Sequence, residues 1–223
     1  MKNYIIALCV ATGSIKATAQ KVAWDSTYRP AIYSQKLAQF RSYPNSSTDI
    51  IFLGNSIMDY TDWNELLQLK EARNRGISGD ISFGVLQRLD EVTEGKPAKI
   101  FVLIGINDIS RNIPDSVILT NYKRIIQRIK TESPKTKIYF NTLFPVNNTY
   151  PDRNHFNKDE HILYVNSELK KMGAAEHITV IDIYPHFLDA ENRLDKKYTY
   201  DGLHPNSEGY LKWAALLKPY VTE

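Results

Sequence analysis

The sequence has 223 residues, of which 43% are hydrophobic and 24% are charged, a globular composition that excludes collagen-like, coiled-coil and disordered chains. Its formal net charge is +3, but Lys2 and Lys16 lie in a segment that resembles a removable leader. Subtracting these two from the 28 basic residues leaves 26 against 25 acidic residues from Gln20 onward, so neither a nucleic-acid-binding nor an anionic-membrane-binding surface is indicated.

The leader, residues 1–19, has the pattern of a secretory signal peptide. Lys2 precedes an apolar run over residues 4–11, and Ala-Thr-Ala at residues 17–19 is the A-x-A pattern that precedes a cleavage site. We therefore expect a soluble protein exported to the periplasm or the exterior, with residues 20–223 as a single domain. No other stretch approaches the roughly 18 apolar residues that a membrane-spanning helix needs.

Alternation of short strands and helices predicts the fold. Residues 25–48 predict a leading helix and loop on the outside of the domain. The predicted strands are short, β-branched and almost continuously apolar, as strands covered on both faces must be. They cover residues 50–53, about 73–77, 100–104, 138–140 and 178–183.

Between the strands, apolar residues recur at three-to-four-residue spacing, which is typical of amphipathic helices. Strands and helices that alternate in this way imply right-handed crossovers and a parallel sheet with helices on both faces. The fold is therefore predicted to be α/β, a three-layer α/β/α sandwich around a parallel five-stranded sheet. The predicted helices cover residues 85–92 ended by Gly95, 117–129, 162–172 ended by Gly173, and about 207–219.

The first strand is followed directly by Gly54-Asn55-Ser56. A serine at this strand-to-helix turn exposes its hydroxyl near backbone N–H groups that can bind an oxyanion. Alternatively, Asn55 or Ser56 only caps the next helix. The G-x-S-x-G elbow of α/β-hydrolases is excluded because Met58 stands where its second glycine should be.

Two more strand ends carry polar segments, and ligands bind at this edge of a parallel sheet. Residues 75–80 follow the second strand, and Gly79 can bring its N–H close to a substrate because it has no Cβ. Residues 105–108 end the third strand, and the Asn107 amide can donate to an oxyanion without being ionised. Ordinary turns are the alternative for both segments, since glycine and asparagine are common turn formers.

The loop before the last helix contains Asp201 and His204. A carboxylate three residues before a histidine can bind the imidazole Nδ1–H, which fixes the tautomer and leaves Nε2 to face a serine. Of the five histidines, only His204 has such a partner at this spacing.

The remaining cysteine and histidine residues predict no metal site. The single cysteine, Cys9, lies in the leader, so the exported chain is expected to have no disulfide, no thiolate nucleophile and no Cys-based zinc site. No HExxH motif or nearby carboxylate pair accompanies the other histidines. We interpret these as surface or loop residues: His155, His161, His177 and His186.

In their order along the chain, the four polar segments resemble the blocks of the GDSL-type or SGNH hydrolase family, which supply Ser, Gly, Asn and His in turn. The resemblance spans about residues 50–221, and residues 105–108 and 201–206 are its most specific parts. It implies a flavodoxin-like α/β/α sandwich, in agreement with the periodicity. The run over residues 74–80 is most similar to the small-acyl branch of platelet-activating-factor acetylhydrolase-like and carbohydrate acetylesterases.

Carried over by position, the resemblance implies a catalytic triad in which Ser56 is the nucleophile, His204 the base and Asp201 the acid that orients it. It also implies an oxyanion hole formed by the N–H groups of Ser56 and Gly79 and by the Asn107 amide. No metal or organic cofactor is implied.

The implied activity is hydrolysis of short-chain acyl esters, with acetyl as the expected acyl group and a small molecule or carbohydrate as the expected substrate. Asn55 departs from the family's usual Gly-Asp-Ser, but the base keeps a partner because the expected triad acid is Asp201. Aromatic residues of the polar loops predict contacts to a sugar ring, with ordinary packing as the alternative for each. They are Trp63, Tyr60 and Tyr150.

Two other functions are consistent with parts of the sequence. A lysophospholipase or thioesterase has the same fold but needs an apolar groove for a long acyl chain. A carbohydrate-binding protein without catalysis is indicated only by Asn55, whereas every triad and oxyanion position holds a competent residue.

Overall fold

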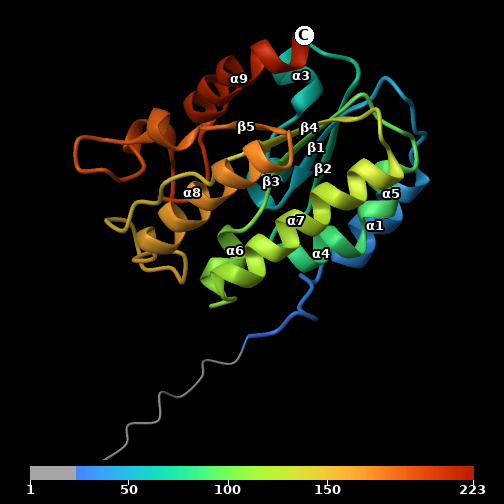
Figure 1. Ribbon diagram of the computed structural model, residues 1–223. Coiled ribbons are helices and arrows are strands. Elements are labelled where there is room, and N and C mark those ends of the chain that lie inside the picture. Colours follow the sequence, from blue (N-terminus) through green and yellow to red (C-terminus); the bar gives the residue numbers. More distant parts are fainter. Residues whose placement is uncertain (1–23) are drawn as a thin grey trace, which may run out of the picture.

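The computed structural model describes residues 24–223, and the expected leader with its cleavage site lies outside them. Five strands form one all-parallel sheet in the order β2-β1-β3-β4-β5 (Figure 1). This topology confirms the predicted α/β sandwich with a five-stranded parallel sheet. The strands are β1 (Ile50–Gly54), β2 (Ala72–Gly76), β3 (Lys99–Leu103), β4 (Lys137–Asn141) and β5 (Thr179–Ile181).

The two central strands explain why the apolar runs were so clear in the sequence. Every residue of β1 and β3 is buried, as expected for strands that have helices on both faces. At the edge of the sheet, β5 spans only three residues and is buried only at Ile181. It is therefore shorter than the predicted 178–183, because strand pairing ends before the apolar run does.

Helices cover both faces of the sheet, with α3 and α9 on one side and α4, α5, α7 and α8 on the other (Figure 1). The long helix α7 buries the apolar stripe that predicted it. The helices are α1 (Tyr33–Ser42), α2 (Ser56–Asp59), α3 (Trp63–Leu67), α4 (Ser82–Gln87), α5 (Leu89–Thr93), α6 (Ile106–Ser110), α7 (Asp115–Glu132), α8 (Asp159–Ala175) and α9 (Ser207–Thr222).

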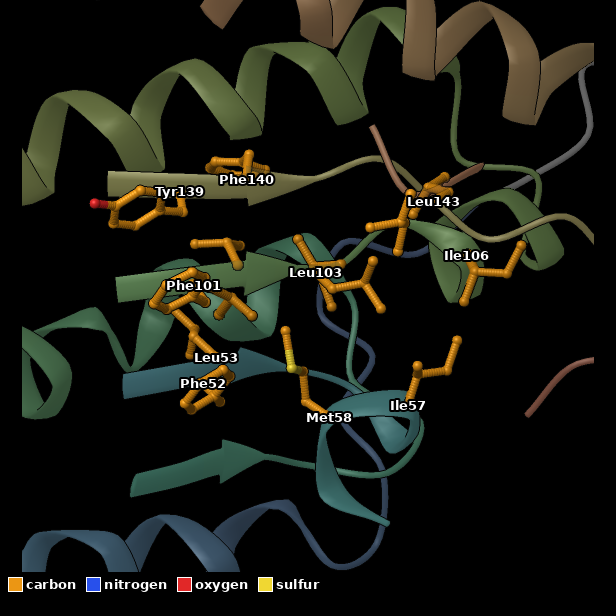
Figure 2. Close-up of a cluster of buried hydrophobic side chains, with 14 of the residues drawn as sticks. Phe52, Leu53, Ile57, Met58, Phe101, Leu103, Ile106, Tyr139, Phe140 and Leu143 are labelled. Carbon is orange, nitrogen blue, oxygen red and sulfur yellow. The ribbon is translucent and has the colours of Figure 1, made fainter. Parts of the chain in front are cut away.

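A row of stacked aromatic rings joins the central strands on the face that α3 and α9 cover. Phe52, Phe101 and Tyr139 occupy paired positions on β1, β3 and β4, and Figure 2 shows them on neighbouring strands. Their ring centroids are 5.1 and 4.5 Å apart, and each stacked pair adds about 0.5–1.5 kcal/mol beyond its area burial. The row continues to Trp63 of α3, whose ring lies 4.2 Å from Phe52.

The short helices at the carboxyl ends of the strands are also anchored by apolar side chains. Ile57 and Met58 of α2 and Ile106 of α6 are buried, and they lie beyond the strand ends in Figure 2. Because Ser56 and Asn107 neighbour these residues in the chain, the core fixes the backbone of two predicted site residues.

Two predicted helix boundaries were wrong. The segment 85–92 is not one helix, because Arg88 leaves the helical conformation and separates α4 from α5. Neither Gly95 nor Gly173 is the left-handed residue that was expected, since Lys96 and His177 adopt positive φ instead. Gly173 lies inside α8, where a Cβ would approach Val180 Cγ2 to 2.4 Å, so close packing of the helix on β5 requires the glycine.

The outer segments agree with their predictions in part. The leading helix expected within residues 25–48 is α1. The last helix, α9, starts at Ser207 as predicted but continues through Pro219 to Thr222. Among residues 24–223, no helix is both long and apolar enough to cross a membrane.

Candidate active site

The four polar segments meet at the carboxyl edge of the sheet. Ser56 begins α2 directly after β1, the loop with Gly79 follows β2, and Asn107 lies in the first turn of α6 after β3. His204 lies in the loop before α9. Segments far apart in the sequence are thus brought to the edge where parallel sheets bind ligands.

Ser56, His204 and Asp201 form a continuous hydrogen-bonded row. Ser56 Oγ lies 2.9 Å from His204 Nε2, and His204 Nδ1 lies 2.8 Å from Asp201 Oδ2. Because a carboxylate only accepts, Nδ1 carries a proton and the neutral imidazole presents the lone pair of Nε2 to the serine hydroxyl. This is the arrangement in which a histidine can remove the serine proton.

The loop around Asp201 holds the carboxylate in place. Its Oδ1 accepts the backbone N–H groups of Leu203 and His204 at 3.0 and 2.8 Å, and its Oδ2 lies 3.0 Å from Arg153 Nη2. Burial raises the pKa of the Asp201 carboxyl, but the hydrogen bonds from His204 and Leu203, together with the nearby His204 ring, outweigh it, so the pKa lies below its ordinary value. The group beside the imidazole is therefore a carboxylate at neutral pH.

Three N–H donors remain for an oxyanion. Gly79 has a φ of +81°, a conformation that favours glycine. Within residues 24–223, neither the Gly79 N–H nor the Ser56 N–H donates to another protein group. Asn107 Nδ2 donates one hydrogen to the backbone oxygen of Asp80 at 2.9 Å, which leaves its second hydrogen for a ligand.

Asn55, which replaces the family's usual aspartate, caps α2. Its Oδ1 accepts the N–H of Ile57 at 3.0 Å, a bond that an aspartate would also make. Its Nδ2 is buried without a partner in the described part of the chain. The capping alternative therefore holds for Asn55, while Ser56 is left free to bind His204.

Arg88, which the sequence did not single out, ties two of the site segments together. It is fully buried and lies 3.1 Å from the Asp80 carboxylate. Its Nη2 also donates to the backbone oxygens of Gly54 and Arg75 at 3.1 and 2.9 Å. The turn that carries Ser56 and the loop that carries Gly79 thus share one guanidinium.

Asp108 anchors the segment that carries Asn107. It is fully buried, and it accepts both the N–H and the Oγ–H of Ser82 at the start of α4. Burial raises the pKa of Asp108 to about 7, even though the Ser82 hydrogen bonds act in the opposite direction. Asp108 is occupied by this contact and does not reach the triad.

A cleft of about 730 Å³ opens beside two of the predicted oxyanion-hole residues. Gly79 and Asn107 line it, together with Arg111 and Arg153. Its other lining residues are mostly polar. They are Trp24, Asp25, Ser110, Asn112, Asp152, Asn154 and His155.

The predicted aromatic contacts divide into one that is wrong and two that stay predictions. Trp63 cannot reach a substrate because it is fully buried and its Nε1 donates to the backbone oxygen of Met58. Tyr60 is 52% exposed and its ring lies 5.0 Å from that of His204. Tyr150 packs against the loop at Gly202.

Tyr200 is an aromatic residue of the site that sequence reasoning missed. It is 56% exposed, and its ring lies 6.0 Å from the His204 ring and nearly parallel to it. The rings of Tyr60 and Tyr200 therefore both lie close to the imidazole. The only sequence signal that could have identified Tyr200 was its position immediately before Asp201.

His155 was interpreted as a surface or loop residue. It lies in a loop, as predicted, but its side chain turns inward and its Nε2 lies 3.0 Å from Asn107 Oδ1. Burial is the main cause that lowers the pKa of His155 to about 4, and nearby His204, Arg153 and Lys158 lower it further. Its imidazole is therefore neutral at neutral pH.

Comparison with known sequences places this geometry in a family context. The GDSL-like lipase/acylhydrolase family model matches residues 52–212. The chain is 30% identical to the platelet-activating factor acetylhydrolase IB subunit alpha2 of Rattus norvegicus over 171 residues, which cover 74% of this chain and 72% of that one.

Two further similarities were found. The chain is 28% identical over 179 residues to the N-acylneuraminate cytidylyltransferase of Escherichia coli, and the match covers 78% of this chain but only 41% of that enzyme. Among solved structures, a Streptococcus pneumonia protein whose description names platelet activating factor superposes with a TM-score of 0.78 at 30% identity. That match covers 85% of this chain and 92% of the other.

Proposed function

The chain belongs to the GDSL-like lipase/acylhydrolase family and is therefore an ester hydrolase. From this premise we propose that it is a serine esterase that removes short acyl groups, above all acetyl groups, from a carbohydrate. The observation that carries the proposal is the 2.9 Å contact between Ser56 Oγ and His204 Nε2, with Asp201 on the other side of the ring. A serine hydroxyl with a positioned base is a nucleophile that can open an ester.

The reaction begins when Ser56 Oγ attacks the ester carbonyl and its proton passes to His204 Nε2. The carbonyl oxygen becomes an oxyanion, which the N–H groups of Ser56 and Gly79 and the amide of Asn107 stabilise. His204 then gives the proton to the departing alcohol, and an acyl-enzyme remains. Water attacks this ester with His204 again as base, and the acid leaves as the proton returns to Ser56.

The cleft favours a polar alcohol over a long acyl chain. Arg111, Arg153, Asn112 and Asn154 line it beside Gly79 and Asn107, and such groups suit the hydroxyls of a sugar better than an alkyl chain. Tyr60 and Tyr200 are both exposed near the His204 ring and can stack on a sugar ring. A lysophospholipase or thioesterase, the alternative, requires an extended apolar groove instead.

The similarity to proteins described as platelet-activating factor acetylhydrolases supports acetyl as the acyl group. We therefore expect kcat/KM for an acetyl ester to exceed that for a decanoyl ester of the same alcohol by at least about tenfold, because a misplaced long chain loses orientation at the reacting carbonyl. Initial rates on a series of 4-nitrophenyl esters measure this.

A second arm of the same experiment tests the alcohol. Acetate release from acetylated sugars and polysaccharides is measured for the wild type, with Ser56→Ala as the blank. Release that depends on Ser56 supports the carbohydrate ester. Faster turnover of decanoyl than of acetyl esters would favour the lysophospholipase or thioesterase alternative, and no turnover of any ester would leave only a binding protein.

Export belongs to the same proposal, because polymeric acetylated carbohydrates lie outside the cytoplasm. The leader pattern at residues 17–19 supports cleavage after Ala19. We expect exported material to begin at Gln20, and its intact mass measures this directly. A mass that includes Met1 would contradict the cleavage.

A further inference from the structure

The side-chain amide of Asn107 is held from two sides. On one side its terminal atom faces the backbone oxygen of Asp80 at 2.9 Å. Since a carbonyl oxygen only accepts, the atom at this position must be the amide nitrogen. The amide oxygen is thereby directed to the other side, where His155 Nε2 lies 3.0 Å away.

This orientation decides the tautomer of His155. An amide oxygen accepts, so His155 Nε2 must carry a proton and donate it to Asn107 Oδ1. The ring is neutral, because burial lowers its pKa to about 4, so Nδ1 carries the lone pair. Nδ1 is buried and has no hydrogen-bond partner in the described part of the chain. The ring is therefore held by the bond from Nε2 to Asn107 Oδ1 alone.

We infer that His155 is a positioning residue that sets the orientation of the Asn107 amide and so aims its free N–H at the oxyanion. Without the His155 bond, the Asp80 contact alone would hold the amide, and the side chain could rotate away from the carbonyl. The inference rests on the proposed function, in which Asn107 donates to the oxyanion.

The inference also explains why a partly buried imidazole lies in this loop. Burying a polar ring with one unpaired nitrogen costs free energy, and an apolar ring of the same size would avoid that cost. A donor aimed at an amide oxygen is of use mainly where the orientation of that amide matters. His155 lines the same cleft as Asn107 and Gly79.

Two substitutions separate the donor from the ring. His155→Phe keeps a planar ring but removes the donor, and we expect it to lower kcat for an acetyl ester by about tenfold, the effect of one lost hydrogen bond. KM should stay within about threefold, because the oxyanion contact is made mainly in the transition state. His155→Gln places an N–H donor at a similar reach and should recover most of the lost kcat.

A double-variant cycle tests whether His155 acts through Asn107. If it does, adding His155→Phe to Asn107→Ala should lower kcat no further, because the amide that it orients is already gone. His161→Phe is the matched control: His161 is an exposed histidine of α8 whose Nδ1 lies 2.9 Å from Asp115. It should keep the wild-type kcat.

The outcomes separate this inference from the proposed function. If Asn107→Ala lowers kcat and His155→Phe does not, or if their effects add, the inference is overturned and the esterase stands. If His155→Phe does not fold, His155→Leu takes its place beside His155→Gln: a kcat of the Leu variant well below that of the Gln variant supports the inference, and equal kcat values overturn it. If the wild type hydrolyses no ester, both are overturned.

Discussion

Ser56→Ala and His204→Ala should each lower kcat for an acetyl ester by roughly 10⁴ to 10⁶, and the double variant should be no worse than the more impaired single variant. The physical reason is that the two residues perform one step. Ser56 without its base is a weak nucleophile, and His204 without the serine has no proton to remove. Steady-state kinetics on the three variants measure the effect.

Ser78→Ala is the matched control for this prediction. The Ser78 hydroxyl lies in the neighbouring loop and donates to Asp59 Oδ2 at 2.7 Å, so it has no histidine partner. Its removal should leave kcat within about threefold of the wild-type value, because Ser78 is half-buried and its hydroxyl does not contact the reacting atoms. Effects of Ser56→Ala and His204→Ala that multiply in the double variant would mean that the residues act independently.

Asn107→Ala has the second largest expected effect, a loss of roughly 10² to 10³ in kcat with KM within a few-fold. The amide contact is worth most when the carbonyl oxygen becomes an oxyanion, so its loss raises the transition state more than the bound substrate. Asn107→Asp should be at least as damaging. A carboxylate supplies no donor, and it would place oxygen against both the Asp80 backbone oxygen and the oxyanion.

A purely structural role for Asn107 predicts a different result. Because Asn107 Nδ2 also binds the Asp80 backbone oxygen, the variants could lose stability without a specific loss of catalysis. Thermal melts alongside kinetics distinguish the two. A lowered melting temperature with normal kcat in the folded fraction would remove Asn107 from the oxyanion hole.

Hydrophobic periodicity predicted the parts of the fold in which burial follows from the local pattern. β1 and β3 were predicted from continuous apolar runs, which are fully buried, and α7 from apolar residues that recur at the helix period and mostly face the core. The edge strand β5 was overextended, since an apolar run does not reveal where a pairing partner ends. Gly95 and Gly173 were expected to end helices in the left-handed conformation, but Lys96 and His177 adopt it instead. Gly173 is required by close packing against Val180.

Two of the missed residues, Arg88 and His155, have partners that are distant in the sequence. Arg88 is 34 residues from Gly54 and His155 is 48 residues from Asn107, and no local pattern predicts either contact. Trp63 was taken for a ligand contact because its loop is polar, but the aromatic row on β1 and β3 buries it. The roles of Ser56, Gly79, Asn107, Asp201 and His204 were predicted because their segments, taken together in chain order, resemble the four blocks of the family, whereas each segment alone was also consistent with a turn or a cap.

The central claim is that Ser56 is the nucleophile of an ester hydrolase, and covalent labelling tests it most directly. An organophosphonate reacts with a serine that has a base partner and an adjacent oxyanion site. The account predicts one phosphonyl group per chain, mapped to the peptide that contains Ser56, and none on Ser56→Ala. A label on Ser78 or Ser207, or an unlabelled wild type that still hydrolyses esters, would contradict it.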